Sequence, residues 1–138
     1  MPTNLASRRL TAFERQSGRC YYCGLPMWLR DPHELADRIA RRPPALGALR
    51  CTAEHLLARQ DGGRDGAGNI AAACLYCNRR RHQRKRALEP SLFRTYVRNR
   101  LWRGKWHPPV LLLAFKEPAF QGQEIACGGS LLRATAVA

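Results

Sequence analysis

Four of the six cysteines form two C-x-x-C pairs, and this pairing limits the possible folds more than any other feature of the sequence. The pairs are Cys20/Cys23 and Cys74/Cys77, with fifty residues between them. Two residues between ligands allow one tight turn to direct both thiolates at one ion, and two such turns complete a tetrahedron around Zn²⁺. We therefore expect a closed, structural zinc site that ties the N-terminal segment to the middle of the chain.

Two alternatives to a zinc site are redox-active dithiols and buried apolar thiols. The redox alternative is disfavoured because no thioredoxin-like βαβ pattern surrounds either pair, and a reducing cytosol favours metal ligands over disulfides. Cys51 and Cys127 belong to neither pair, and we expect both to be buried thiols without an assigned role.

The charge of the chain indicates its class of partner. The 138 residues include 24 Lys+Arg and 10 Asp+Glu, which gives a formal net charge of +14. A surplus of this size suits a polyanion, with nucleic acid favoured over an anionic membrane surface. The hydrophobic content of 45% supports a folded core rather than a disordered basic tail.

The sequence offers no segment suited to a membrane. The longest apolar run, 110–115, is far shorter than the ~20 residues that a membrane helix needs. No apolar stretch follows the N-terminus as it does in a signal peptide. We therefore expect a soluble, cytoplasmic protein.

The order of hydrophobic periodicities and turn signals predicts an α+β protein. Glycine and proline residues lie between the segments that have a hydrophobic periodicity, and they set the boundaries of the predicted elements. These elements are a helix at 4–16, an insertion at 25–50, strands at 52–57 and 69–73, basic helices at 78–87 and 90–103, and an apolar strand-like run at 110–115.

Within the insertion, Asp31, Pro32 and Glu34 have the pattern of a helix start with a capping box. The second cysteine turn lies well beyond this start, so the insertion separates the two C-x-x-C pairs along the chain. We expect one domain over residues 1–106. A C-terminal extension follows at 107–138, and the sequence assigns it no role.

A second pattern lies between and just after the cysteine pairs, and its members in chain order are Glu54-His55, Gly62-Gly63, Asn69-Ile70 and Asn78. Together with the C-Y-Y-C-G turn at 20–24, this order resembles the zinc-containing HNH endonuclease family. That family has an acidic residue and a His, a Gly-Gly loop, an Asn before an aliphatic residue, and a C-x-x-C followed by His or Asn. The resemblance covers residues 18–24 and 52–86, and it implies the family's ββα-metal fold.

The resemblance also implies roles for these residues. His55 is expected to be the general base, because a neutral imidazole can take a proton from water near neutral pH. Glu54 and Asn78 are expected to bind one catalytic Mg²⁺ or Mn²⁺, and His82, one helical turn after Asn78, is a further candidate ligand. Asn69 is expected to brace the loop against the His55 backbone. Neighbouring strand residues point to opposite faces, which would separate the base from the metal.

Two positions depart from the family pattern. Glu54 stands where Asp is commoner, and Ala58 stands where Pro often follows the His. Taken singly, each motif residue also has a simpler interpretation: Glu54-His55 as a polar pair on a half-exposed strand, Asn69 as a turn residue, and Asn78 as a helix cap.

The basic residues indicate where nucleic acid would bind. Residues 78–86 carry six cations in nine positions, although a solvated helix face is the simpler alternative. Trp28 and Trp102 are expected to pack rather than to stack on bases. The candidate nucleic-acid-binding residues are Arg79, Arg80, Arg81, Arg84, Lys85, Arg86, Arg94 and Arg98.

These patterns predict a metal-dependent endonuclease that hydrolyses DNA phosphodiester bonds, with RNA as another candidate substrate. The alternative is a zinc-stabilised nucleic-acid-binding module without catalysis, which needs only the zinc and the basic residues. Glu54, His55 and Asn78 separate the two, because the module does not require them. The oligomeric state, monomer or homodimer, stays open, since one such site cuts one strand.

Overall fold

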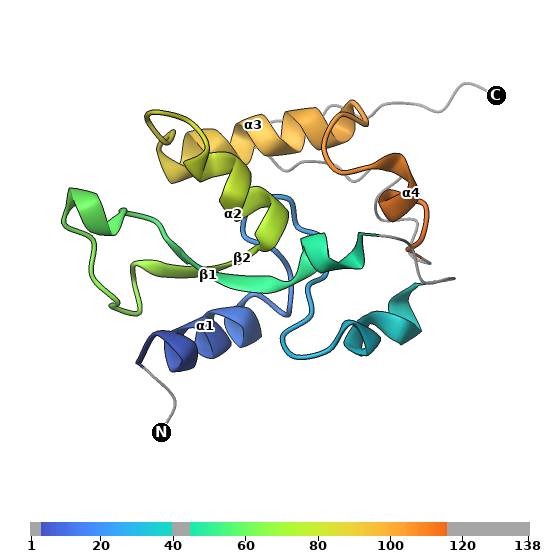
Figure 1. Cartoon of the computed structure of the whole chain (residues 1–138), viewed down its shortest axis with the longest axis horizontal. Helices are drawn as coiled ribbons and strands as arrows, with labels where there is room; N and C mark the ends of the chain where they lie inside the picture. The colour runs from blue at the N-terminus through green and yellow to red at the C-terminus, as the bar shows by residue number, and fades with distance from the viewer. Residues whose placement is uncertain (1–3, 40–44, 116–138) are drawn as a thin grey trace, which may run out of the picture.

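Two antiparallel strands and the helix that follows them form the centre of the fold (Figure 1). The computed structural model describes residues 4–39 and 45–115. Strand β1, Cys51–His55, pairs with β2, Ile70–Cys74, and Cys51 lies opposite Cys74. Helix α2, Leu75–His82, begins directly after β2. The predicted α+β class and its strand, loop, strand, helix order are confirmed.

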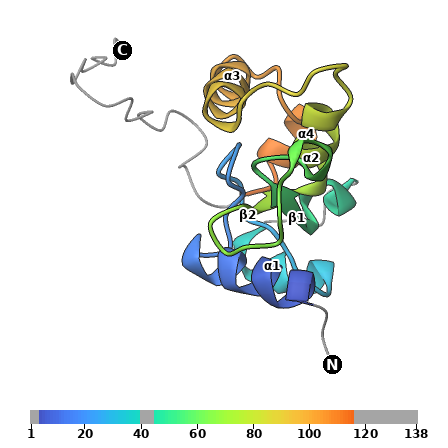
Figure 2. The same cartoon turned by 90° about the vertical axis from the view of Figure 1, so that its left-hand side faces the viewer.

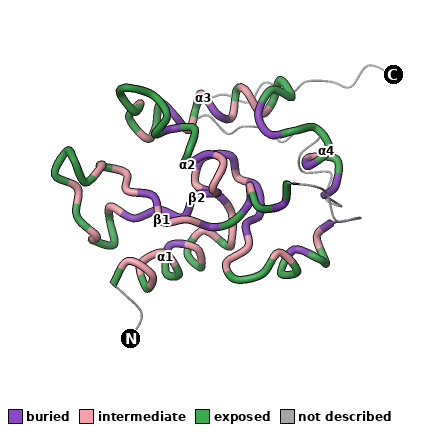
Figure 3. Tube along the Cα trace, in the orientation of Figure 1, coloured by how far each residue is buried: buried purple, intermediate pink, exposed green. Residues whose placement is uncertain are grey.

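Helices cover both faces of this hairpin. Helix α1, Asn4–Arg15, packs against one face and α2 against the other, while α3, Pro90–Trp102, lies beyond α2 (Figures 1 and 2). All of β2 is therefore buried (Figure 3). Three of its residues, 71–73, are alanines that let both helices approach closely. Alanine has a low strand propensity, so burial on both faces decides the conformation here.

A side chain joins the end of α1 to the outer edge of β2. The Gln16 amide accepts a hydrogen bond from the Ala72 N–H at 2.9 Å and donates one to the Ala72 carbonyl at 2.8 Å, as a neighbouring strand would. The backbone N–H of Tyr21 donates to the same carbonyl at 2.9 Å. These bonds place the first C-x-x-C turn beside β2.

The segment predicted as an insertion contributes to the core. Its 3₁₀ helix η1, Pro32–Arg38, begins after Asp31, whose side chain accepts from the His33 N–H at 2.7 Å. Glu34 accepts from the Asp31 N–H at 3.0 Å, so the predicted capping box is confirmed. Leu35 packs in the core. The remaining short elements are η2, Leu46–Leu49, η3, Arg59–Asp61, and α4, Pro109–Leu112.

The prediction of a basic helix over 78–87 is wrong in its extent. Helix α2 begins earlier, at Leu75, because the second cysteine turn forms its first turn. It ends at His82, so Arg84, Lys85 and Arg86 lie in the exposed connection to α3.

The prediction of a strand-like run over 110–115 is also wrong. Residues Pro109–Leu112 form helix α4, because a proline at the first helical position fixes a φ that suits a helix start. Phe115 forms an isolated bridge with Ile39. Within the two described ranges, no helix has the length and apolar character needed to cross a bilayer.

Aromatic rings join α3 and the following segment to the first cysteine turn. Tyr22 and Phe93 pack edge to face with ring centroids 4.9 Å apart, and Phe93 lies 6.0 Å from Trp106. Leu111 is buried in the same cluster. The first part of the expected C-terminal extension therefore shares this core, whereas Cys127 lies outside the described residues.

Candidate functional site

The two cysteine turns meet in one buried cluster. The sulfur atoms of Cys20, Cys23, Cys74 and Cys77 all lie within 4.8 Å of one another. The sulfurs of Cys23 and Cys74 are 4.0 Å apart. Tetrahedral Zn²⁺ with Zn–S bonds of about 2.3 Å separates its sulfur ligands by about 3.8 Å, so the cluster fits this ion. Four thiolates would fill the coordination sphere of such an ion, which is the arrangement of structural rather than catalytic zinc sites.

Nitrogen donors surround the cluster and suit thiolate sulfur. The Cys74 N–H donates to the Cys20 sulfur at 3.3 Å, and the Cys77 N–H donates to the Cys74 sulfur at 3.4 Å. The Trp106 indole N–H donates to the Cys77 sulfur at 3.3 Å. Because Cys74 also caps the N-terminus of α2, the positive end of the helix dipole favours the charged thiolates.

Burial and mutual hydrogen bonds shift the pKa values of the four thiols in the cluster. Burial raises the pKa of Cys23, Cys74 and Cys77. Burial opposes ionisation of Cys20 as well, but hydrogen bonds from the other three thiols overcome it and hold its pKa well below the usual range. Cys51 is a buried thiol outside the cluster, as expected, and burial raises its pKa to about 12.

His107 lies beside this cluster, although no spacing rule marked it in the sequence. Its Nε2 is 4.0 Å from the Cys74 sulfur, and burial lowers its pKa to about 4. The ring is therefore neutral near pH 7. Its buried Nδ1 has no hydrogen-bond partner among the described residues.

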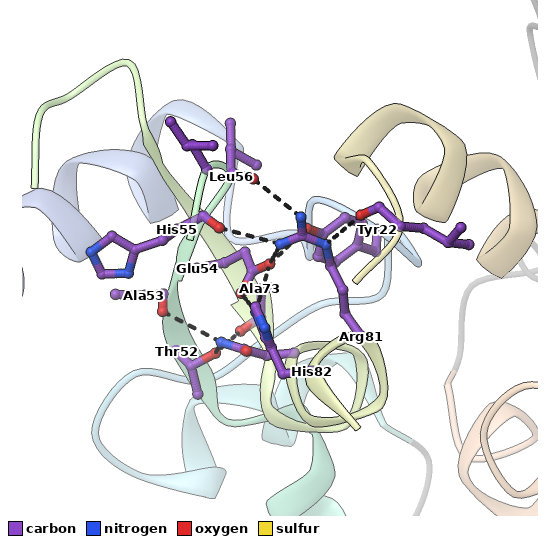
Figure 4. A network of polar contacts seen from close by, with 12 residues as sticks. Tyr22, Thr52, Ala53, Glu54, His55, Leu56, Ala73, Arg81 and His82 are labelled. Carbon is purple, nitrogen blue, oxygen red and sulfur yellow. Dashed lines mark hydrogen bonds and ion pairs between the residues drawn. The ribbon is translucent and has the colours of Figure 1, made fainter. Parts of the chain in front are cut away.

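Strand β1 presents Glu54 and His55 on opposite sides (Figure 4). Glu54 faces α2 and the first cysteine turn, and its side chain is 1% exposed. The His55 ring points away from Glu54 and α2, and its side chain is 15% exposed. The two motif neighbours therefore meet different surroundings.

Three side chains bind the Glu54 carboxylate. The Tyr22 hydroxyl donates to its Oε1 at 2.8 Å, and the Arg81 guanidinium forms an ion pair with the same oxygen. His82 Nε2 lies 3.1 Å from Oε2. Burial raises the pKa of Tyr22, and the charge of Glu54 raises it further, so Tyr22 keeps its proton and remains a donor.

The placement of Arg81 corrects one sequence expectation. Arg81 is buried, and besides Glu54 its donors bind the carbonyls of His55, Leu56 and Leu88 at 3.1–3.2 Å. These contacts leave the guanidinium inside the fold, where a nucleic-acid phosphate does not reach it. Arg81 thus holds the end of β1 against α2.

His55 contacts two residues of the loop that follows β1. Its Nε2 lies 2.7 Å from Asp65 Oδ1. Arg59 donates to both oxygens of the Asp65 carboxylate at 2.8 Å. Sequence reasoning found neither Asp65 nor Arg59, because no motif position marks an acid at this distance from the His.

Asn69 braces the same loop. Its side chain accepts from the Leu57 N–H at 2.7 Å and donates to the carbonyls of Leu57 at 3.0 Å and Arg64 at 2.9 Å. The contact falls two residues after His55 rather than on its backbone. Gly63 fits this loop because a Cβ there would lie 1.8 Å from the Leu57 carbonyl oxygen.

Asn78 lies on α2, where its Nδ2 donates to Thr52 Oγ1 at 2.9 Å and to the Ala53 carbonyl at 3.4 Å. The Thr52 hydroxyl donates in turn to the Ala73 carbonyl at 2.7 Å. This chain of bonds ties α2 to both strands. It also orients the amide of Asn78 beside the face that holds Glu54 and His82.

The remaining basic residues of α2 and the connection after it are exposed, and two of them stack on aromatic rings. Arg79 and Arg80 line a groove of about 360 Å³ beside η2. The guanidinium of Arg80 lies 4.9 Å from the ring centroid of Tyr76, and that of Arg84 lies 4.9 Å from the ring centroid of Tyr96. Exposed positive charge continues at positions 85 and 86.

Two arginines of α3 lie against the first cysteine turn. Arg94 sits 5.0 Å from the ring centroid of Tyr21, and Arg98 Nε donates to the Tyr22 carbonyl at 3.3 Å. Trp28 packs as expected and donates to the Leu46 carbonyl, whereas Trp102 is 65% exposed and does not pack.

Comparison with known proteins matches one family model to this part of the chain. Residues 44–84 match the HNH endonuclease family, from just before η2 to just beyond the end of α2. This segment of the chain is similar to an HNH endonuclease domain. No curated protein and no solved structure matches the chain. Domains of this family are generally nucleases that act on nucleic acids, and the matched segment contains every catalytic candidate named from the sequence.

The cysteine cluster predicts one tightly held zinc ion per chain. Cys77→Ala is expected to lose the zinc and to unfold at much lower temperature, because a structural zinc contributes ~10–16 kcal/mol of binding free energy to small domains. Zinc content, measured by mass spectrometry of the metal after gel filtration, and thermal unfolding test this expectation. Cys51→Ala is the control and should retain the zinc. A zinc-free wild-type protein with unchanged stability would contradict the assignment.

The loop between β1 and β2 predicts that the effect of a glycine replacement on stability depends on its position. Gly63→Ala should lower the free energy of unfolding by about 1–3 kcal/mol, because its Cβ collides with the Leu57 carbonyl. Gly66→Ala is the matched control, since a Cβ there meets nothing within 4 Å; it should change stability by less than about 0.5 kcal/mol. Urea unfolding distinguishes the two, and equal effects would show that the loop is built differently.

Proposed function

We propose that this protein is a metal-dependent endonuclease that hydrolyses DNA phosphodiester bonds through its HNH domain. The observation that carries the proposal is the placement of His55 and Glu54 on opposite sides of one strand inside the family-matched segment. A phosphate at the edge of β1 would meet an imidazole from one side and a metal ligand set from the other. Hydrolysis in line requires this separation of the attacking and leaving sides.

His55 is the proposed general base. Its ring is partly exposed and stands outside the buried Glu54 cluster, so it can reach a water molecule. A neutral imidazole takes a proton from that water and activates it for attack on phosphorus. Asn69 keeps the loop beside this ring in place through its three hydrogen bonds.

Glu54, His82 and Asn78 are the proposed ligands of a divalent ion. His82 Nε2 lies 3.1 Å from Glu54 Oε2, which is close to the separation of about 3 Å between adjacent ligands of an octahedral ion at about 2.1 Å. Carboxylate and amide oxygens suit Mg²⁺ and Mn²⁺, and both tolerate several waters. Such an ion would act as a Lewis acid on the departing 3′ oxygen.

Arg81 influences the affinity of the three proposed ligands for a cation. Its guanidinium neutralises Glu54 and occupies Oε1, so one carboxylate oxygen, Oε2, faces His82. Little net negative charge then remains to attract a divalent ion in the free protein. We therefore expect the ion to bind together with the substrate phosphate, whose charge completes the site.

The proposed path of the nucleic acid follows α2. Around α2, Arg79 lies about 60° from His82 and Arg80 lies about 160° from it, and both line the groove beside η2. Lys85 and Arg86 continue the exposed positive charge after the helix. Contacts of this kind hold the phosphate backbone and carry no base specificity.

The proposal predicts metal-dependent cleavage that needs His55. Supercoiled plasmid incubated with the protein and Mg²⁺ or Mn²⁺ should be nicked or linearised, and chelation of the ion by EDTA should stop the reaction. His55→Ala should reduce the rate by ~10²–10⁴-fold, the typical contribution of a positioned base. His33→Ala is the control, because that side chain is exposed and bound to Asp31 far from the site along the chain.

The outcomes separate the candidate functions. Cleavage of RNA but not DNA would correct the substrate. Salt-sensitive binding without cleavage of either nucleic acid would overturn the proposal in favour of a zinc-stabilised binding module. An unchanged rate in His55→Ala would remove His55 from its proposed role.

The proposed path predicts a selective decrease in affinity. Arg79→Ala/Arg80→Ala should weaken binding to a labelled duplex and reduce the slope of log K against log salt by about one for each phosphate that the protein no longer binds. Fluorescence anisotropy in the absence of divalent ions measures both quantities. Arg15→Ala, exposed on α1 at the opposite face of the hairpin, should leave them unchanged. Equal effects of the two changes would argue against a path along α2.

A further inference from the structure

The polar contacts of His55 single out a residue that the HNH motif does not contain. Asp65 Oδ1 lies 2.7 Å from His55 Nε2, and the two side chains are 30% and 15% exposed. Among residues 4–39 and 45–115, no hydrogen bond reaches the other ring nitrogen, Nδ1. One nitrogen is therefore held by the protein, and the other is free for a reactant.

The contact with Asp65 fixes which nitrogen carries the proton. The hydrogen bond from His55, with further help from Arg59, holds the pKa of Asp65 below its usual range, so the group is a carboxylate near pH 7. A carboxylate only accepts hydrogen bonds, and Nε2 must then supply the hydrogen. Arg59 Nε also lies 3.3 Å from His55 Nε2, but two N–H groups cannot form a hydrogen bond with each other. The contact of Nε2 with the Asp65 carboxylate is shorter and involves an anion, so Nε2 carries the hydrogen and donates it to Asp65.

Arg59 in turn holds the carboxylate. One nitrogen of its guanidinium donates to both Asp65 oxygens at 2.8 Å. Its side chain is 61% exposed, so this ion pair contributes little to stability. Its effect is orientation, because it limits the rotation of Asp65 that would release the His55 ring.

We propose that Asp65 is the positioning residue of the general base: it binds His55 Nε2–H and thereby presents the Nδ1 lone pair to the attacking water. This inference rests on the proposed nuclease function. As the water attacks phosphorus, the bond from phosphorus to the departing 3′ oxygen breaks, Nδ1 takes the proton of the water, and the ring becomes an imidazolium. Nε2–H stays bound to Asp65, whose negative charge stabilises that cation, and no proton passes to the carboxylate.

Proton NMR tests the hydrogen bond without reference to activity. A bound Nε2–H exchanges slowly with water and should give a resolved signal that is absent from His55→Ala. The signal should also disappear in Asp65→Ala and persist in Asp61→Ala. Asp61 is the matched control, because it belongs to the same loop and its replacement removes the same charge. Zinc content and thermal unfolding confirm that each variant is folded.

Steady-state cleavage of a labelled oligonucleotide tests the role. In Asp65→Ala, kcat should fall by about 10–10²-fold while KM stays within about twofold, because the base is misplaced but the substrate still binds. Asp65→Asn should keep part of the rate, since its amide oxygen can accept the Nε2–H bond without the charge. Arg59→Ala should lower kcat less than Asp65→Ala, and Asp61→Ala should not lower it.

Each result decides between named alternatives. A wild-type protein that cleaves while Asp65→Ala keeps its full kcat would reduce Asp65 to a surface ion-pair partner of Arg59. An Nε2–H signal that survives in Asp65→Ala would overturn the hydrogen bond itself. A wild-type protein that cleaves no nucleic acid would overturn the proposed function and the positioning role with it, even if the NMR signal behaves as expected.

Discussion

The cluster of four cysteines is the constraint on which the rest of the structure depends. Cys74 is both the last residue of β2 and the cap of α2, so the cluster fixes the angle between the hairpin and the helix. That angle brings His82 within 3.1 Å of Glu54. The first turn also carries Tyr22, which binds the same carboxylate. Loss of the cysteine cluster would therefore move the proposed metal ligands apart, although none of them belongs to that cluster.

Neighbouring side chains of β1 point to opposite sides of the strand, and this alternation divides the site into two chemical environments. On one side, Glu54 is buried with Arg81 and Tyr22, and the cluster has little freedom to move. On the other side, His55 is tied to the glycine-rich loop through Asp65. The buried side resembles a structural core that retains one available carboxylate oxygen, whereas the loop side leaves the His55 ring partly exposed, where a substrate can reach it.

Much of the fold followed from local sequence rules, whereas the partners of the site did not. The cysteine spacing, the hairpin and the Asp31 capping box depend on neighbours in the sequence, and the structure confirms them. The burial of Arg81 and the contact between Asp65 and His55 depend on how α2 and the loop pack against β1. A helical run of arginines does not reveal which one points inward, and only the position of Glu54 selects it.

A two-stranded ribbon ordinarily leaves two edges open to other chains. Here the outward-facing groups of β2 are bound by the Gln16 amide and by the sulfur of Cys20. On β1, Asn78 and Arg81 bind the outward carbonyls of Ala53 and His55, and the Cys51 N–H donates to the Trp28 carbonyl. Side chains thus take the place of a neighbouring strand along much of both edges, and they obstruct the addition of a further strand. We therefore expect a second copy of the chain, if it assembles with this one to cut both strands of a duplex, to meet it through helices or loops.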